Sequence, residues 1–340
     1  MRCDTSHFSL ERRDFLKAAM ASLAATGFGA EALAMQRDGA SGIATRKLGR
    51  HDERISIVGL GGYHIRLLDD ADAIRVMHEA IDEGMTFFDN AWDYHGGGSE
   101  EIMGKALADE GRRDKVFLMT KVCDRDYEGA KKHLEDSLRR LKTDRIDLWQ
   151  FHEINWAVDA DWLFDQGGVK AAIEARKEGK VRYIGFTGHR APMHLLRTID
   201  RPFAWDAVQM PINLFDAHYR SFQEEVLPVC REKQIAPIGM KGLAGGRLPK
   251  EIGVPAELCR RFALSLPITS LICGIQSREN LLQDLAMARS FKPVDEQEME
   301  RLIAKAEAGG RDGKLEPWKT TDYGGQHHRD QHKDVDRGES

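Results

Sequence analysis

Four side chains in the sequence have the types that acid–base chemistry requires. Asp89, Tyr94, Lys121 and His152 each lie at the end of a short apolar run or a few residues after one. A lysine among apolar residues is costly to bury alone, so we expect Lys121 to pair with Asp89. We also expect that a close, desolvated lysine lowers the pKa of the Tyr94 phenol from about 10 towards about 7. His152 would then hold a carbonyl oxygen near the tyrosine hydroxyl.

The elements that must position these residues alternate between buried strands and amphipathic helices. Several apolar runs are continuous, which is typical of parallel strands covered on both faces. Eight strands alternating with about eight helices favour a (β/α)8 barrel, with an open doubly wound sheet as the alternative. In such a barrel, functional groups lie at the carboxyl ends of the strands. The eight expected strands are 55–60, 85–88, 116–120, 146–151, 181–186, 207–210, 236–240 and 268–273.

We place the barrel domain at residues 35–308, and we expect two segments to lie outside the closed barrel itself. Residues 45–54 are expected to form a hairpin that closes the bottom of the barrel. Residues 309–340 are polar and glycine-rich, which predicts a solvated, flexible tail. That tail contains three histidines that could bind a metal, namely His327, His328 and His332.

The first 34 residues have the order of an export signal. The charged stretch 11–17 precedes a weakly apolar run, and Ala32-Leu33-Ala34 offers a small-x-small cleavage site. Arg12 and Arg13 followed by Phe-Leu-Lys resemble the twin-arginine signal, although Glu11 stands where Ser or Thr is usual. The resemblance implies contact with the export machinery and a periplasmic location. The alternative is a cytosolic amphipathic helix, and the run is too short to favour a membrane anchor.

Composition narrows the possible partners of the chain. The 340 residues are 41% hydrophobic and 31% charged, which excludes a collagenous or wholly disordered chain. A net charge of −5 gives no indication of a nucleic-acid surface. The five cysteines include no pair with CxxC spacing, so we expect neither a disulfide framework nor a common zinc motif. A small molecule is therefore the expected partner.

The polar residues at the strand ends resemble those of the aldo-keto reductase family. The resemblance covers roughly residues 45–290 and rests on Phe-Asp-Asn-Ala-Trp-Asp-Tyr ending at Tyr94, Gly-Ser-Glu-Glu at 98–101, Met-Thr-Lys121 and Gln-Phe-His152. It implies a (β/α)8 barrel in which hydride passes between a nicotinamide cofactor and a carbonyl or alcohol. By position, Tyr94 is the general acid, Lys121 and Asp89 tune it, and His152 orients the carbonyl.

The same resemblance implies a cofactor site with several departures. Gln209 matches the family's carboxamide contact, whereas Thr187 stands where Ser is frequent and Met240 where an aromatic residue is usual. Asn280 replaces an arginine that often binds the 2′-phosphate of NADP, and Arg278 could substitute for it. NADP is therefore expected, with NAD as an alternative. The remaining expected contacts are Gly242, Leu243, Gly245 and Arg247 in a pyrophosphate loop, and Gly274 and Gln276 near the adenosine.

Two other functions fit parts of the sequence. A nicotinamide-binding sensor or regulatory barrel with little turnover would explain the departures at Met240 and Asn280, and at Gly188, which stands where the family often has Asn. A metal-dependent hydrolase would use histidines and aspartates at the strand ends, but no HxH pair follows the first strand. The glycines at 59–62 lack the third spaced glycine of a dinucleotide-binding fingerprint.

Overall fold

The fold is an eight-stranded closed barrel of parallel strands, as predicted. The computed structural model describes residues 34–334 except 38, 110 and 322, so the expected signal segment 1–34 lies outside the described residues apart from Ala34. Neighbouring barrel strands pair in chain order, and the last strand pairs with the first. The strands are β4 (Val58–Gly61), β5 (Phe87–Asp89), β6 (Phe117–Val122), β7 (Ile146–Phe151), β8 (Val181–Thr187), β9 (Ala207–Pro211), β10 (Ala236–Met240) and β11 (Ser270–Cys273).

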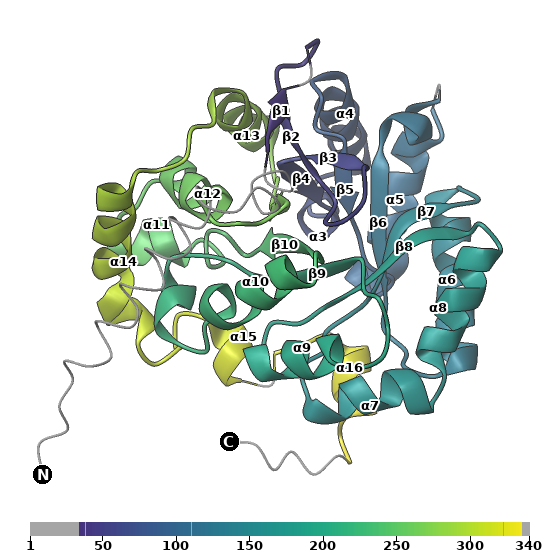
Figure 1. Cartoon of the computed structure of the whole chain (residues 1–340). Coiled ribbons are helices and arrows are strands. Elements are labelled where there is room, and N and C mark those ends of the chain that lie inside the picture. The colour runs from purple at the N-terminus through teal and green to yellow at the C-terminus, as the bar shows by residue number, and fades with distance from the viewer. Residues whose placement is uncertain (1–33, 38, 110, 322, 335–340) are drawn as a thin grey trace, which may run out of the picture.

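Helices surround the barrel because each buries one apolar face against the strands (Figure 1). In α6 (Tyr127–Leu141), the Asp126 side chain caps the first turn by accepting from the Gly129 amide, and Leu134, Leu138 and Leu141 are buried. The other long helices are α4 (Asp70–Asp82), α5 (Gly98–Leu107), α7 (Ala157–Asp165), α8 (Gly168–Lys177), α9 (Pro192–Ile199), α10 (Phe222–Glu232), α12 (Ala256–Ser265), α13 (Arg278–Ser290) and α14 (Glu296–Gly310). The short helices are α3 (Gly62–Ile65), α11 (Arg247–Ile252), α15 (Pro317–Thr320) and α16 (Gln326–Gln331).

A small antiparallel sheet closes the amino-terminal end of the barrel. It contains β1 (Gln36–Arg37), β2 (Ala44–Lys47) and β3 (Arg54–Ser56), so the expected hairpin exists but is broader than residues 45–54. The apolar run 55–60 was predicted as one strand, but it divides at Ile57 between β3 and β4. The run serves two sheets because residues 54–56 pair with β2, whereas 58–60 pair with β11.

The carboxyl-terminal segment packs on the barrel, which differs from the solvated tail that its composition predicted. Helices α15 and α16 lie on the opposite side of the barrel from β1–β3 (Figure 1). The Lys319 ammonium is fully buried, 2.6 Å from an Asp216 oxygen and 2.8 Å from a Glu316 oxygen. Buried ion pairs therefore hold this segment against the barrel. Hydropathy alone assigns such charged residues to the surface, which is why the sequence predicted a solvated tail.

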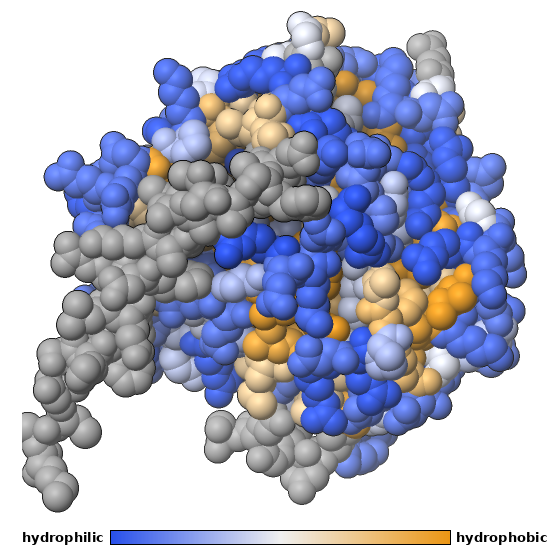
Figure 2. All heavy atoms as spheres, in the orientation of Figure 1, coloured by the Kyte–Doolittle hydropathy of each residue, from blue (hydrophilic) through white to orange (hydrophobic). Residues whose placement is uncertain are grey.

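The described surface carries mostly hydrophilic side chains. Figure 2 shows hydrophobic side chains in separate patches on the visible face, with charged residues between them. Among the described residues, no helix is both long enough and apolar enough to cross a bilayer.

Candidate active site

Three of the four residues expected to do chemistry come from neighbouring strands and meet at one rim. Asp89 is the last residue of β5, Lys121 lies in β6, and His152 directly follows β7. Tyr94 begins the short helix η1 (Tyr94–Gly97) five residues after Asp89. Parallel strands in a barrel present their carboxyl ends on one side, which brings these separate segments together.

Lys121 is the centre of this group. Its ammonium forms a close ion pair with Asp89, donates to the Asn90 carbonyl at 2.7 Å and lies 3.4 Å from the Tyr94 hydroxyl. The side chains of Lys121 and Asp89 are only 1% and 5% exposed. A buried charge is tolerated when it is paired and hydrogen-bonded, so this pair is held in one arrangement.

The environment raises the pKa of Tyr94 well above its ordinary value of 10. Burial is the largest cause, followed by the negative charges of Asp89, Asp93 and Glu153. This direction is opposite to the lowering that we expected from Lys121. Burial opposes ionisation of the phenol most strongly, and the charges of Asp89 and two further carboxylates oppose it as well, so the nearby lysine does not lower this pKa. Tyr94 therefore holds its proton and can act as a donor.

His152 packs edge-on to Tyr94, with ring centroids 5.6 Å apart. Its Nδ1 lies 3.2 Å from an Asp93 oxygen. Although burial opposes the effect, His152 lowers the pKa of Asp93 below the ordinary range, so this carboxylate is ionised. Asp93 lies inside the motif that ends at Tyr94, but no role for it was predicted from the sequence.

The Gly-Ser-Glu-Glu segment supports the site without facing it. The Ser99 hydroxyl donates to the Gly62 carbonyl at 2.7 Å. A buried Glu100 oxygen accepts from Thr120 at 2.7 Å, and the other lies 3.2 Å from an Arg140 nitrogen. These bonds tie α5 to the ends of β4 and β6 and fix the loop that carries Tyr94.

Of the residues expected to contact a nicotinamide, Gln209 lies beside the buried Asp89–Lys121 pair. Gln209 in β9 is buried, and its Nε2 lies 3.4 Å from the second oxygen of Asp89. Its Oε1 has no hydrogen-bond partner among the described residues. Thr187 ends β8 and accepts from the Glu153 amide at 3.0 Å, and Met240 ends β10.

The expected pyrophosphate loop follows β10 in a compact conformation. Gly245 has a left-handed φ of 64°, and a Cβ there would meet only the Arg247 side chain. Such a glycine lets backbone amides approach a phosphate closely. Arg247 begins α11, Leu243 packs partly buried against the core, and Gly242 lies against Leu271.

The expected adenosine-binding residues are engaged with one another or with neighbouring side chains. Arg278 begins α13 and forms two hydrogen bonds with Glu79, of 2.7 and 2.6 Å. The Asn280 side chain accepts from the Gln276 amide at 3.4 Å. At Gly274 a Cβ would lie 2.9 Å from the His64 ring.

The carboxyl-terminal segment covers part of the same rim. Tyr323 lies 5.2 Å from the His189 ring, and the Lys241 ammonium lies 5.3 Å from the Tyr323 ring. The Gly325 amide donates to Glu153 at 3.2 Å. A cavity of about 20 Å³ lies between this segment and the loops after β7 and β8, which is room for roughly one water molecule. These contacts join residues far apart in the chain, so no sequence pattern indicated them.

Comparisons with known proteins agree with this arrangement. Residues 57–254 match the model of the "Aldo/keto reductase family". The uncharacterized oxidoreductase YrpG of Bacillus subtilis is 34% identical over 226 residues, which cover 59% of this chain and 67% of that protein. The aldo-keto reductase YhdN of the same organism is 31% identical over 202 residues, which cover 54% and 56% of the two chains.

Among solved structures, the holo form of the aldo-keto reductase AKR11C1 from Bacillus halodurans superimposes with a TM-score of 0.67. The two proteins are 24% identical, and the superposition covers 79% of this chain and 100% of the other, which supports a shared barrel fold. The family match spans more than half of the sequence and includes the four residues that meet at the rim. The chain therefore belongs to the aldo/keto reductase family and is an oxidoreductase.

Proposed function

We propose that this enzyme transfers hydride between NADP and a carbonyl or alcohol substrate, with Tyr94 as the general acid and base. The observation that carries the proposal is the position of the Lys121 ammonium, which contacts Asp89 and lies 3.4 Å from the Tyr94 hydroxyl. A buried phenol beside a cation is suited to giving up a proton to a carbonyl oxygen as that oxygen becomes an alkoxide.

Each of the four residues has a separate task in this proposal. Tyr94 donates its proton to the carbonyl oxygen, and Lys121 stabilises the phenolate that remains until solvent returns the proton. Asp89 keeps the lysine charged and oriented. His152 holds the carbonyl oxygen near the phenol. The nicotinamide supplies or accepts the hydride when the cofactor is bound.

The residues present fit a nicotinamide cofactor. The Gln209 Oε1 atom is buried without a hydrogen-bond partner among the described residues, and a carboxamide NH2 group would satisfy it. The open glycine loop at 245–246 suits a pyrophosphate. For the 2′-phosphate of NADP, we propose Arg278, which would exchange its bond with Glu79 for the phosphate.

The direct test is consumption of NADPH by the purified protein with a panel of carbonyl compounds. We would use an aliphatic aldehyde, an aromatic aldehyde, a quinone and an open-chain sugar, and follow nicotinamide absorbance. Turnover with at least one of them, lost in Tyr94→Phe, is the expected result. Tight NADPH binding without turnover would instead favour a nicotinamide-binding sensor. Turnover that survives in Tyr94→Phe would remove the assigned acid.

We also propose that residues 1–34 direct export to the periplasm through the twin-arginine route. Arg12 and Arg13 support this proposal, because paired arginines before an apolar run are the main feature of that signal. Replacing both with lysine should keep the protein in the cytoplasm of an expressing cell. Fractionation and the mass of the amino-terminal peptide would measure this. An unprocessed amino terminus in the unsubstituted protein would contradict it.

A further inference from the structure

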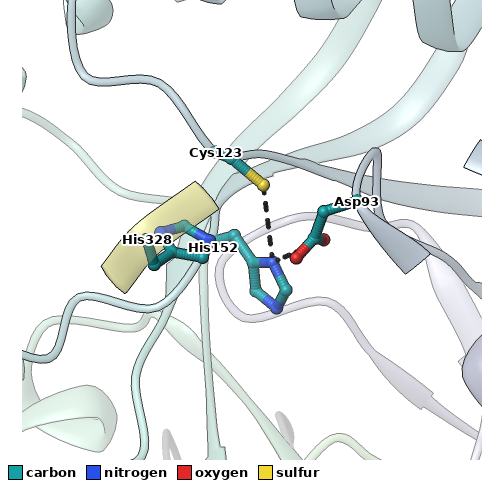
Figure 3. Close-up of side chains that lie close together, drawn as sticks. All are labelled: Asp93, Cys123, His152 and His328. Carbon is teal, nitrogen blue, oxygen red and sulfur yellow. Dashed lines mark hydrogen bonds and ion pairs between the residues drawn. The ribbon is translucent and has the colours of Figure 1, made fainter. Parts of the chain in front are cut away.

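Four side chains with metal-binding atoms converge beside the proposed active site. Asp93 follows β5, Cys123 follows β6, His152 follows β7, and His328 comes from α16 in the carboxyl-terminal segment (Figure 3). One ligand atom from each residue lies within 4.8 Å of the others. Three segments of the rim and one distant segment therefore surround a single point.

The separations within this group approach those around a tetrahedral ion. Bonds of about 2.0–2.3 Å to N, O and S atoms at tetrahedral angles place neighbouring ligand atoms roughly 3.3–3.6 Å apart. The His152 Nδ1 atom lies 3.2 Å from the Asp93 oxygen and 3.9 Å from the Cys123 sulfur. Small side-chain movements would bring the four ligand atoms to these separations.

The hydrogen bonding of His328 is a second, independent indication of a ligand. The residue is 4% exposed, yet neither of its ring nitrogens has a hydrogen-bond partner among the described residues. The nearest carboxylate oxygen, from Glu153, lies 3.8 Å from the His328 Nε2 atom, which is beyond hydrogen-bond distance. A buried polar atom without a partner costs free energy, and such an atom in a folded protein often marks an ion or water.

A neighbouring cluster shows how possible ligands can instead be held by hydrogen bonds within the protein. Asp124, His133 and His327 also have ligand atoms close together. There, however, the His327 ring is 2.5 Å from an Asp124 oxygen, and Gln331 donates to the same oxygen at 2.8 Å. Asp124 and His327 are thus satisfied by hydrogen bonds within the protein. One ring nitrogen of His133 lies 3.3 Å from Asp124, whereas neither ring nitrogen of His328 has a hydrogen-bond partner among the described residues.

We propose that Asp93, Cys123, His152 and His328 bind one divalent transition-metal ion of the Zn²⁺ class. A thiolate, two imidazoles and a carboxylate favour zinc over magnesium or calcium. The thiol releases its proton to solvent on binding, so one thiolate and one carboxylate balance the two charges of the ion. Four protein ligands leave no open position, and the ion is therefore structural.

The proposed ion has a defined consequence for the fold. His328 is the ligand that comes from the carboxyl-terminal segment, so the ion would fasten α16 to the rim of the barrel. It would also occupy Nδ1 of His152, which leaves the proton of that ring on Nε2. This goes beyond hydride transfer, because the site would form whether or not the enzyme turns over a carbonyl.

Metal binding to the full chain can be measured without any activity assay. The protein is stripped with a chelator, incubated with Zn²⁺ alone, and analysed for metal content, with affinity taken from chelator competition. One Zn²⁺ per chain is expected. Co²⁺ used in its place should give the visible bands of a tetrahedral ion and a thiolate charge-transfer band. Substoichiometric zinc, or cobalt bound without the thiolate band, would overturn the proposal.

Substitutions identify the ligands. His328→Gln should weaken Zn²⁺ binding by more than about a hundredfold, since losing even an outer partner of a metal ligand typically costs ten- to a hundredfold. The matched control is His327→Gln, which changes the adjacent residue of α16 and should leave the affinity unchanged. Cys123→Ser should remove the charge-transfer band. If that buried variant does not fold, His328→Gln decides, and equal affinities in the two histidine variants would refute the site.

Discussion

The two ends of the proposed cofactor site are built in different ways. At the reacting end, formed by Asp89, Tyr94, Lys121 and His152, the charges are buried and in contact with one another. At the adenosine end, residues 274–280, Arg278 is 66% exposed and pairs with Glu79 on the surface. Buried charges must find their partners within the chain, whereas a surface pair gains little and can be exchanged for a ligand. In the proposed site, buried groups therefore determine the chemistry, and exposed side chains determine the cofactor preference.

The largest expected effect comes from removing Tyr94, the proposed proton donor at the reacting end. Tyr94→Phe should lower kcat by about 10²–10⁴-fold, the usual contribution of a positioned general acid. Binding of NADPH, followed by fluorescence titration, should hardly change. Tyr63→Phe is the matched control, because Tyr63 packs edge-on to Tyr94 at 5.4 Å but is 48% exposed. Equal rates in the two variants would contradict the assignment of Tyr94.

Lys121→Met tests whether the same end is stabilised by its buried ion pair. The substitution leaves the Asp89 carboxylate buried without its cation, which should lower the free energy of unfolding by about 3–5 kcal/mol. Chemical denaturation would measure the loss. Adding Asp89→Asn to this variant should restore much of the stability but none of the activity. If Lys121→Met alone were as stable as the unsubstituted protein, the ion pair between Lys121 and Asp89 would not be formed.

The reacting end was also the part of the site that could be predicted best from the sequence. Asp89, Lys121 and His152 each follow an apolar run, and the carboxyl ends of parallel strands must meet. The direction of the Tyr94 pKa could not be predicted in this way. It depends first on the burial of the phenol and then on nearby carboxylates, among them Asp93 and Glu153, which lie in loops and follow no strand period.

The carboxyl-terminal segment shows a second limit of sequence patterns. Lys319, Asp216 and Glu316 are all hydrophilic, so composition assigns them to solvent, yet they form one buried cluster. Only the mutual pairing of their charges makes that burial tolerable, and pairing between residues about a hundred positions apart has no periodic signal. The same holds for His328, whose neighbours come from the ends of the barrel strands.

A smaller effect is expected at the adenosine end. Arg278→Ala should weaken NADPH binding by about tenfold and leave NADH binding unchanged, because only NADPH carries the 2′-phosphate. Titration of both nucleotides would measure the difference. Arg289→Ala is a suitable control, since Arg289 lies in the same helix and pairs with Glu83. Equal losses for the two nucleotides would mean that Arg278 acts on the fold and not on the phosphate.

The smallest effect is expected from the partner of Arg278. Glu79 holds the guanidinium through two hydrogen bonds, so a 2′-phosphate has to compete with this carboxylate. Glu79→Gln removes the competing charge and should tighten NADPH binding by a few-fold, because an exposed pair of this kind is weak. NADH binding should again stay the same. Unchanged NADPH affinity in Glu79→Gln, together with a loss in Arg278→Ala, would mean that the arginine binds phosphate without leaving its carboxylate partner.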